Sequence, residues 1–158
     1  MTEADQAHLR RAIALAHEAR AKGQAPFGAV VLAPDGKMLA EAHNTVAASG
    51  DPTAHAELAA IREAGMRHGL EALAGAAVYA STEPCPMCAA AAYNAGIGRI
   101  VFGLRAGDLP RARGGPTPWL PLQLPAAEVA ARGRRRMVVE GPFLEGEAAA
   151  PHAGLGSA

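Results

Sequence analysis

The sequence predicts an α/β protein, a three-layer α/β/α sandwich around a five-stranded mixed sheet. Its segment order supports this class: a helical pattern opens the chain, two apolar segments joined by a turn follow, and helix-like and strand-like segments then alternate. The 158 residues suit one domain with a sizeable core. We expect that domain to span residues 1–145. An Ala/Gly-rich tail at 146–158 is expected to be either disordered or packed over a functional site.

The first predicted element is an amphipathic helix near the N-terminus. Thr2 to Asp5 form a capping-box pattern, in which two side chains satisfy each other's backbone N–H groups. Apolar residues then recur at helical spacing, at Leu9, Ile13 and Ala16. Gly23 is expected to end this helix, because glycine adopts the left-handed conformation that closes many helices.

Short apolar runs bounded by turn residues predict five strands. Two of these runs flank Pro34-Asp35-Gly36-Lys37, which predicts a hairpin because proline, aspartate and glycine favour tight turns. Helical patterns separate the later strands from one another. The expected strands are Phe27–Leu32, Met38–Asn44, Ala76–Ala80, Arg99–Gly103 and Met137–Glu140.

Two of the remaining helices begin beside residues that matter later. Asp51 is expected to be an N-cap with Pro52 at the first helical position, which would place His55 just inside the helix. Pro86 similarly suits the first turn of the next helix. Helices are expected over Pro52–Gly65, Pro86–Ala95 and Ala126–Arg132.

The segment 104–125 is expected to be an irregular loop. It holds five prolines and three glycines, which is too broken a pattern for regular structure and long for a simple connection. Loops of this kind are often lids over functional sites. Trp119, the only tryptophan, lies here and is a candidate substrate contact. A surface loop with Trp119 packed into the core is the alternative.

Charge is balanced overall but unevenly distributed. The formal net charge is zero, yet residues 99–136 hold eight arginines against only Asp108 and Glu128. Such asymmetry indicates either a nucleic-acid face or a solvated surface, and the solvated surface is favoured for Arg134 to Arg136. No apolar run is long enough to span a bilayer, and the N-terminus does not resemble a signal peptide.

The chemistry of the sequence concentrates in His55-Ala56-Glu57 and Pro84-Cys85-Pro86-Met87-Cys88. Thiolates and neutral imidazoles are the preferred ligands of zinc, and a catalytic zinc keeps its fourth position open. His55, Cys85 and Cys88 supply three ligands and no obvious fourth. The sequence therefore predicts one catalytic Zn²⁺ per chain. Because this motif uses both cysteines, no disulfide framework remains, and a reducing, cytoplasmic setting is expected.

Glu57 is expected to act beside the metal without binding it. Zinc makes water nucleophilic near neutral pH, and a carboxylate two residues from a ligand can carry a proton from that water to a leaving amine. Taken singly, each residue has a plainer interpretation. A Cys-Pro-x-Cys pair alone is typical of a dithiol redox site, and an isolated histidine or helical glutamate is usually structural or solvated. The combined H-x-E…P-C-x-x-C pattern is a signature of zinc nucleobase deaminases.

The chain resembles the cytidine deaminase superfamily, within it the branch of bacterial guanine deaminases and tRNA adenosine deaminases. The resemblance covers roughly residues 25–103. It implies zinc ligation by His55, Cys85 and Cys88, a proton shuttle at Glu57, parallel fourth and fifth strands, and a homodimer. The matching segments are Pro26-Phe27-Gly28-Ala29-Val30, Asn44, Asp51-Pro52-Thr53-Ala54-His55-Ala56-Glu57 and Glu83-Pro84-Cys85-Pro86-Met87-Cys88.

The resemblance also implies a substrate pocket. Asn44 corresponds to the family's base-binding asparagine, the backbone around Ala56 to its base-facing segment, and Phe27 is expected to pack on the base or wall the pocket. An acidic C-terminal residue that helps to bind guanine corresponds to one of Glu140, Glu145 and Glu147. Pro26 to Val30 resembles guanine deaminases, but their acidic Phe-Asp-Asp-like loop element is missing, and Gly115 to Trp119 stands there instead.

These features favour hydrolytic deamination of a free purine base, such as guanine, or of a related small amino-heterocycle. Adenosine deamination in tRNA is the alternative, but the Lys-x-Gly-Ala-x-Gly-Ser-like stretch of those enzymes is replaced here by Leu104 to Pro110. An RNA partner is therefore less favoured than a small molecule, and no membrane partner is expected. A dithiol redox protein or a structural zinc module is the alternative from another class.

Overall fold

The computed structural model describes residues 1–117 and 122–156, and its centre is a five-stranded mixed sheet in the order β2-β1-β3-β4-β5. The strands are β1 Gly28–Leu32, β2 Met38–His43, β3 Ala77–Thr82, β4 Arg99–Leu104 and β5 Val138–Glu140. Strand β1 is antiparallel to β2 and β3, whereas β3, β4 and β5 run parallel. The predicted fold class is therefore confirmed, and so are the parallel fourth and fifth strands.

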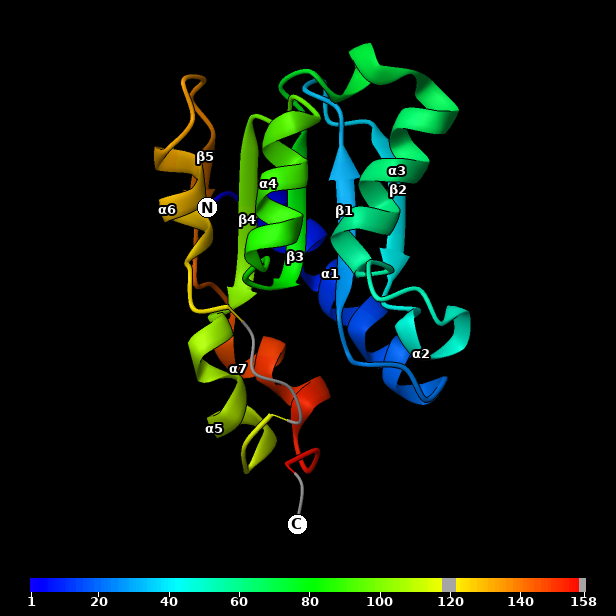
Figure 1. Cartoon of the computed structure of the whole chain (residues 1–158), viewed down its shortest axis with the longest axis vertical. Coiled ribbons are helices and arrows are strands. Elements are labelled where there is room, and N and C mark those ends of the chain that lie inside the picture. Colours follow the sequence, from blue (N-terminus) through cyan, green and yellow to red (C-terminus); the bar gives the residue numbers. More distant parts are fainter. Residues whose placement is uncertain (118–121, 157–158) are drawn as a thin grey trace.

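Helices lie on both faces of this sheet. The α-helices are α1 Glu3–Ala21, α2 Val46–Ser49, α3 Ala56–His68, α4 Pro86–Asn94, α5 Leu109–Arg113, α6 Ala126–Ala131 and α7 Glu145–Ala149. Three short 3-10 helices complete the described elements: η1 Leu70–Leu73, η2 Ala106–Asp108 and η3 Ala150–His152. Helices α3, α4 and α6 cover one face, and α1 crosses the other (Figure 1). In the described part of the chain, no helix is both long and apolar enough to cross a membrane.

Alternating residues of the strands pack into two hydrophobic cores, one on each face of the sheet. Along β1, Val31 packs with the α3 and α4 side, whereas Val30 packs with the α1 side, as the two-residue repeat of a strand requires. Gly28 lets α1 approach β1 closely, because a Cβ there would lie 2.2 Å from the carbonyl oxygen of Ala12. The Pro-Phe-Gly segment thus fixes where β1 begins against α1.

An ionic network around the buried Asp5 carboxylate ties the first helix to the last two strands. The Asp5 carboxylate, at the capped start of α1, is 4% exposed and accepts hydrogen bonds from Tyr79 on β3 and Arg99 on β4. Arg99 also donates to Glu140 on β5. The Arg99 guanidinium holds the pKa of Asp5 well below its usual range. The predicted capping box of Thr2 and Asp5 is present as well.

The start of the second predicted helix is wrong by four residues. Helix α3 begins at Ala56 with His55 as its N-cap, so His55 does not lie inside the helix. Asp51 is not the cap, because its carboxylate instead accepts local bonds from the backbone N–H and hydroxyl of Thr53. Aspartate readily forms such local turns, and this one delays the helix until Ala56.

The two irregular segments expected near the C-terminus are more ordered than their composition indicates. Residues 104–125 contain η2 and α5, so the expectation of no regular structure is wrong there. Trp119 lies outside the described residues. The tail forms α7 and η3, and its Ala148, Pro151 and His152 are buried. Of the two alternatives expected for the tail, the described residues 146–156 are therefore ordered and pack in part against the domain.

Candidate metal centre

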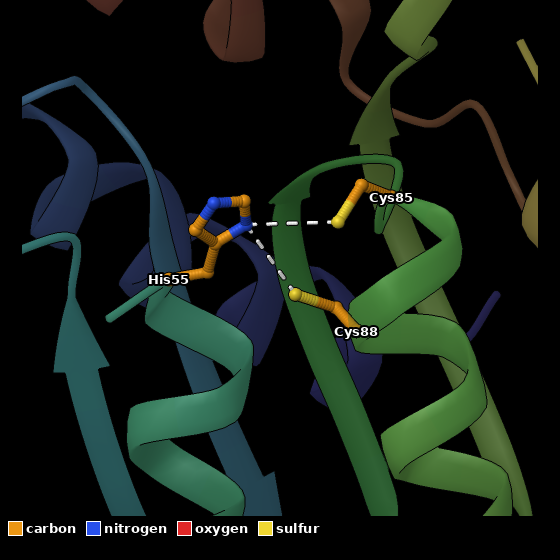
Figure 2. Close-up of side chains that lie close together, drawn as sticks. All are labelled: His55, Cys85 and Cys88. Carbon is orange, nitrogen blue, oxygen red and sulfur yellow. Dashed lines mark hydrogen bonds between the residues drawn. The ribbon is translucent and has the colours of Figure 1, made fainter. Parts of the chain in front are cut away.

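Two helix N-termini bring the three predicted zinc ligands together. His55 is the N-cap of α3, Cys85 is the N-cap of α4, and Cys88 lies in the first turn of α4. Figure 2 shows the imidazole and both sulfur atoms pointing toward one another across the gap between these helices. Pro86 occupies the first turn of α4, where its missing N–H costs no helical hydrogen bond.

The distances among these atoms fit a tetrahedral zinc. Nδ1 of His55 lies 3.6 Å from Sγ of Cys85 and 3.5 Å from Sγ of Cys88. A zinc ion with bonds of about 2.3 Å to sulfur and about 2.0–2.1 Å to nitrogen separates such atoms by roughly 3.6 Å in a tetrahedron. The three ligand atoms all lie within 4.8 Å of one another. The fourth corner of the tetrahedron is left for a non-protein ligand by this donor set.

The electrostatics of the cysteine pair also favour a cation. Hydrogen bonding from Cys88, and then from His55, lowers the pKa of Cys85 to about 4, whereas the Cys85 thiolate raises the pKa of Cys88. One thiolate therefore forms readily, and a second is opposed by the first. A dication would remove this opposition, because its charge balances two thiolates. The neighbouring Cys85 thiolate raises the pKa of His55 in the same way.

Glu57 lies in the first turn of α3 and is only 8% exposed. Burial, which disfavours the charged carboxylate, raises the pKa of Glu57 to about 7. The side chain interacts with Cys88 and lies in the field of Cys85 and His55, so it belongs to the same cluster. A carboxyl group with a pKa near neutrality can both accept and release a proton at physiological pH.

Asn44 and Phe27 are joined to the metal centre through the backbone. The backbone N–H of Asn44 donates to the carbonyl of Phe27 at 3.0 Å, and that of Thr45 donates to the carbonyl of Ala54, next to His55. The side-chain oxygen of Asn44 accepts from the N–H of Val46, which leaves the amide NH₂ as the group that can donate to a ligand. Ala56, the first residue of α3, is fully buried.

The three acidic residues considered for substrate binding near the C-terminus have different surroundings in the structure, which the sequence alone did not distinguish. Glu140 pairs with Arg99, and Glu147 pairs with Arg10 on α1. Glu145 instead lines a hollow of about 440 Å³ between α5 and α7, together with Arg111 and other residues. None of the three carboxylates belongs to the group of side chains that can hold the metal.

Glu83, two residues before Cys85, makes long-range hydrogen bonds that could not be predicted from the sequence. Its carboxylate accepts hydrogen bonds from the backbone N–H groups of Ala106 and Ala126, at 3.3 and 3.1 Å. Both ends of the segment between β4 and α6 are thus fastened beside the turn that carries Cys85. The Glu-Pro-Cys motif contains this residue, but no spacing in the sequence indicates its distant partners.

Comparisons with known proteins agree with this site. The family model described as the cytidine and deoxycytidylate deaminase zinc-binding region matches residues 2–104. A probable cytosine deaminase of Schizosaccharomyces pombe is 36% identical over an alignment 161 residues long, which covers 98% of this chain and 94% of that protein. The guanine deaminase of Bacillus subtilis is 49% identical over 86 residues, about half of each chain.

A solved structure also resembles this chain over most of its length. It comes from a study of A-to-I editing by tRNA:A34 deaminases and covers 92% of this chain and 99% of its own, with a TM-score of 0.74 and 30% identity. These relatives differ in the substrates that their names give. The chain therefore belongs to the cytidine and deoxycytidylate deaminase family and carries its zinc-binding deaminase domain.

Proposed function

We propose that this protein is a zinc-dependent hydrolytic deaminase that releases ammonia from a free nucleobase, a purine such as guanine or a related small amino-heterocycle. The observation that carries the proposal is the buried Glu57 carboxyl group beside three zinc ligands that leave one coordination position open. Neither a redox pair nor a structural zinc module requires a buried acid at this place.

The roles of the residues follow from their chemistry. His55, Cys85 and Cys88 would hold the zinc, which supplies the Lewis acid that makes water nucleophilic near neutral pH. Glu57 takes the proton from the attacking water and delivers it to the amino nitrogen, which leaves as ammonia. Burial raises the pKa of Glu57 to about 7 in the zinc-free protein, and this effect opposes the lowering by a bound cation, which helps the carboxyl group to perform both transfers near neutral pH.

Substrate recognition is assigned to Asn44, Phe27 and the backbone at Ala56. The NH₂ of the Asn44 side chain donates to an acceptor atom on the heterocycle, and the Phe27 ring packs against the ring plane. A planar base suits this combination of one aromatic face and a few polar groups. Trp119 stays a prediction, since it lies outside the described residues.

The arginine-rich segment gives less support to an RNA substrate than its composition indicates. Four of the eight arginines in residues 99–136 are engaged within the protein, namely Arg99, Arg111, Arg113 and Arg135. Arg135 binds the carbonyls of Tyr93 and Ile97 at the C-terminal end of α4, whereas the zinc cysteines lie at its N-terminal end. A nine-residue helix separates its ends by roughly 13 Å, so Arg135 does not border the metal centre.

The deciding experiment is an ammonia-release screen of the zinc-loaded protein. Its substrates are guanine, adenine, cytosine, their nucleosides, aminotriazines and a tRNA anticodon stem-loop. Release from one or more free bases is the expected result, and the end-to-end match with a probable cytosine deaminase is the reason to include cytosine. Release from the stem-loop alone would replace the proposal by tRNA adenosine deamination. A Cys85–Cys88 disulfide in the active protein would instead favour redox chemistry.

A homodimer and a cytoplasmic location belong to this proposal as expectations of the family resemblance and of cysteine usage. Light scattering on the purified protein tests the first of them. A monomer at working concentration would contradict it.

A further inference from the structure

His152 in η3 is a fully buried histidine that the zinc chemistry does not use. Its ring is tilted against the ring of Phe27, with centroids 5.2 Å apart. Its Nε2 lies 3.3 Å from the hydroxyl oxygen of Thr82. Its Nδ1 is buried and has no hydrogen-bond partner within the described parts of the chain. A buried polar atom without a partner is costly, so simple space filling would favour an apolar side chain here.

The two contacts of His152 lead to segments that form the metal centre. Phe27 immediately precedes β1 and accepts the backbone hydrogen bond of Asn44. Thr82 is the last residue of β3, three residues before Cys85. His152 therefore packs against Phe27, one of the residues proposed to face the substrate, although it comes from the far end of the chain.

The segment around His152 is fixed from two sides. The guanidinium group of Arg20 on α1 donates to the carbonyls of Pro151 and Ala153. The guanidinium group of Arg113 on α5 donates to the carbonyl of Leu155 at 2.6 Å. These bonds hold the backbone on either side of the ring, so the ring itself has a defined position against Phe27.

We propose that His152 is a positioning residue that holds the Phe27 ring against the substrate base, so that the C-terminal segment sets substrate affinity. This inference rests on the proposed function, because the contact between Phe27 and a base is part of it. The imidazole acts as a neutral aromatic ring, since burial lowers the pKa of His152 to about 4.

Kinetics of two variants test the inference on the free base that releases ammonia fastest. His152→Ala removes the ring and should raise KM about tenfold, the value of one aromatic contact, with kcat within about twofold. His152→Phe keeps a ring and should restore most of the affinity. Zinc content should equal that of the wild type in both. A purely structural role would reduce the active fraction, which lowers kcat and leaves KM unchanged.

His8 provides the matched control. Its ring is also tilted against an aromatic ring, that of Tyr79, with centroids 5.3 Å apart. It lies on α1 near the Asp5 network, away from Phe27. His8→Ala should therefore leave KM unchanged. An unchanged KM in His152→Ala, or an equal rise in His8→Ala, would overturn the inference.

A second measurement needs no substrate. Fluorine NMR of protein labelled with fluorophenylalanine gives signals for three rings, and Phe27→Leu identifies that of Phe27. The Phe27 signal should shift in His152→Ala and stay in place in His8→Ala. If the wild type deaminates no base, the proposed function fails, whereas this spectrum still tests whether the Phe27 ring packs on His152. An unmoved Phe27 signal would overturn the inference independently.

Discussion

Replacing Glu57 by glutamine separates proton transfer from metal binding. The amide has nearly the same shape as the carboxyl group but cannot accept and release a proton. Because general acid–base catalysis typically contributes about 10²–10⁴-fold, turnover should fall by about that factor. The zinc ligands are unchanged, so zinc content should stay at one per chain. Cys88→Ala is the contrast, since it should lose zinc and activity together.

The same substitution should make the zinc-free protein more stable at high pH. Glu57 is 8% exposed, and burial raises its pKa to about 7 from an unfolded value near 4.5. The unfolded glutamate ionises first, so wild-type stability falls as the pH rises from about 4.5 to 7. This difference between the folded and unfolded pKa values lowers the free energy of unfolding of the wild type by about 3 kcal/mol at pH 8, but by less than about 1 kcal/mol at pH 5. Glutamine carries no charge and avoids this loss.

Urea unfolding of zinc-free wild type and Glu57→Gln at pH 5 and pH 8 measures the effect. Zinc must be removed, because a bound cation would favour the carboxylate and reduce the difference. Ammonia release and zinc content are measured on the loaded proteins in parallel. Near-full turnover in Glu57→Gln would refute the assigned shuttle. An equal stability difference at both pH values would refute the role of burial.

Three further results are expected. Arg99→Leu leaves the buried Asp5 carboxylate without its cationic partner, so urea unfolding should show a loss of about 3 kcal/mol; a loss below about 1 kcal/mol would contradict this. Burial and neighbouring cationic side chains lower the pKa of His152 from 6.5 to about 4 in the folded protein. The unfolded chain therefore binds a proton first, and the free energy of unfolding should fall by about 3 kcal/mol as the pH drops from 6.5 to 4. His152→Phe should remove that dependence, and an unchanged pH profile would count against it. Asn44→Ala should raise KM for the base about tenfold with zinc retained, because one donor to the ring is lost. A ligand-bound structure with Asn44 remote from the base would remove the assignment.

The metal centre was accessible from sequence because its ligands lie within two short motifs. His55 and the two cysteines carry their chemistry in residue type and spacing, so the prediction required no knowledge of distant contacts. The start of α3 was harder to predict, because Asp51 has two favourable uses. Its carboxylate can cap a helix or bind Thr53 locally, and only the folded chain decides between them.

The packed C-terminal tail shows a different limit. Small residues make the contact between the tail helix α7 and strand β4. A Cβ on Gly103 would lie 2.6 Å from the Cβ of Ala148. The two elements therefore approach closely only because neither residue is large. Small-to-small packing leaves no hydrophobic periodicity to detect, and an Ala/Gly-rich composition is also typical of disorder. The links from Glu83 to Ala106 and Ala126 were unpredictable for a related reason, since they join a side chain to distant backbone groups.

The ion pair between the buried Asp5 and Arg99 has a consequence for biosynthesis. A ribosome delivers Asp5 long before Arg99, an interval of roughly 5–19 s at about 5–20 residues per second. Until Arg99 emerges, the Asp5 carboxylate has no cation to offset its dehydration, so α1 cannot dock stably on the emerging sheet. The apolar strands between them stay exposed during that interval. Well over half of the chain must therefore be synthesised before this ion pair can hold α1 on the sheet.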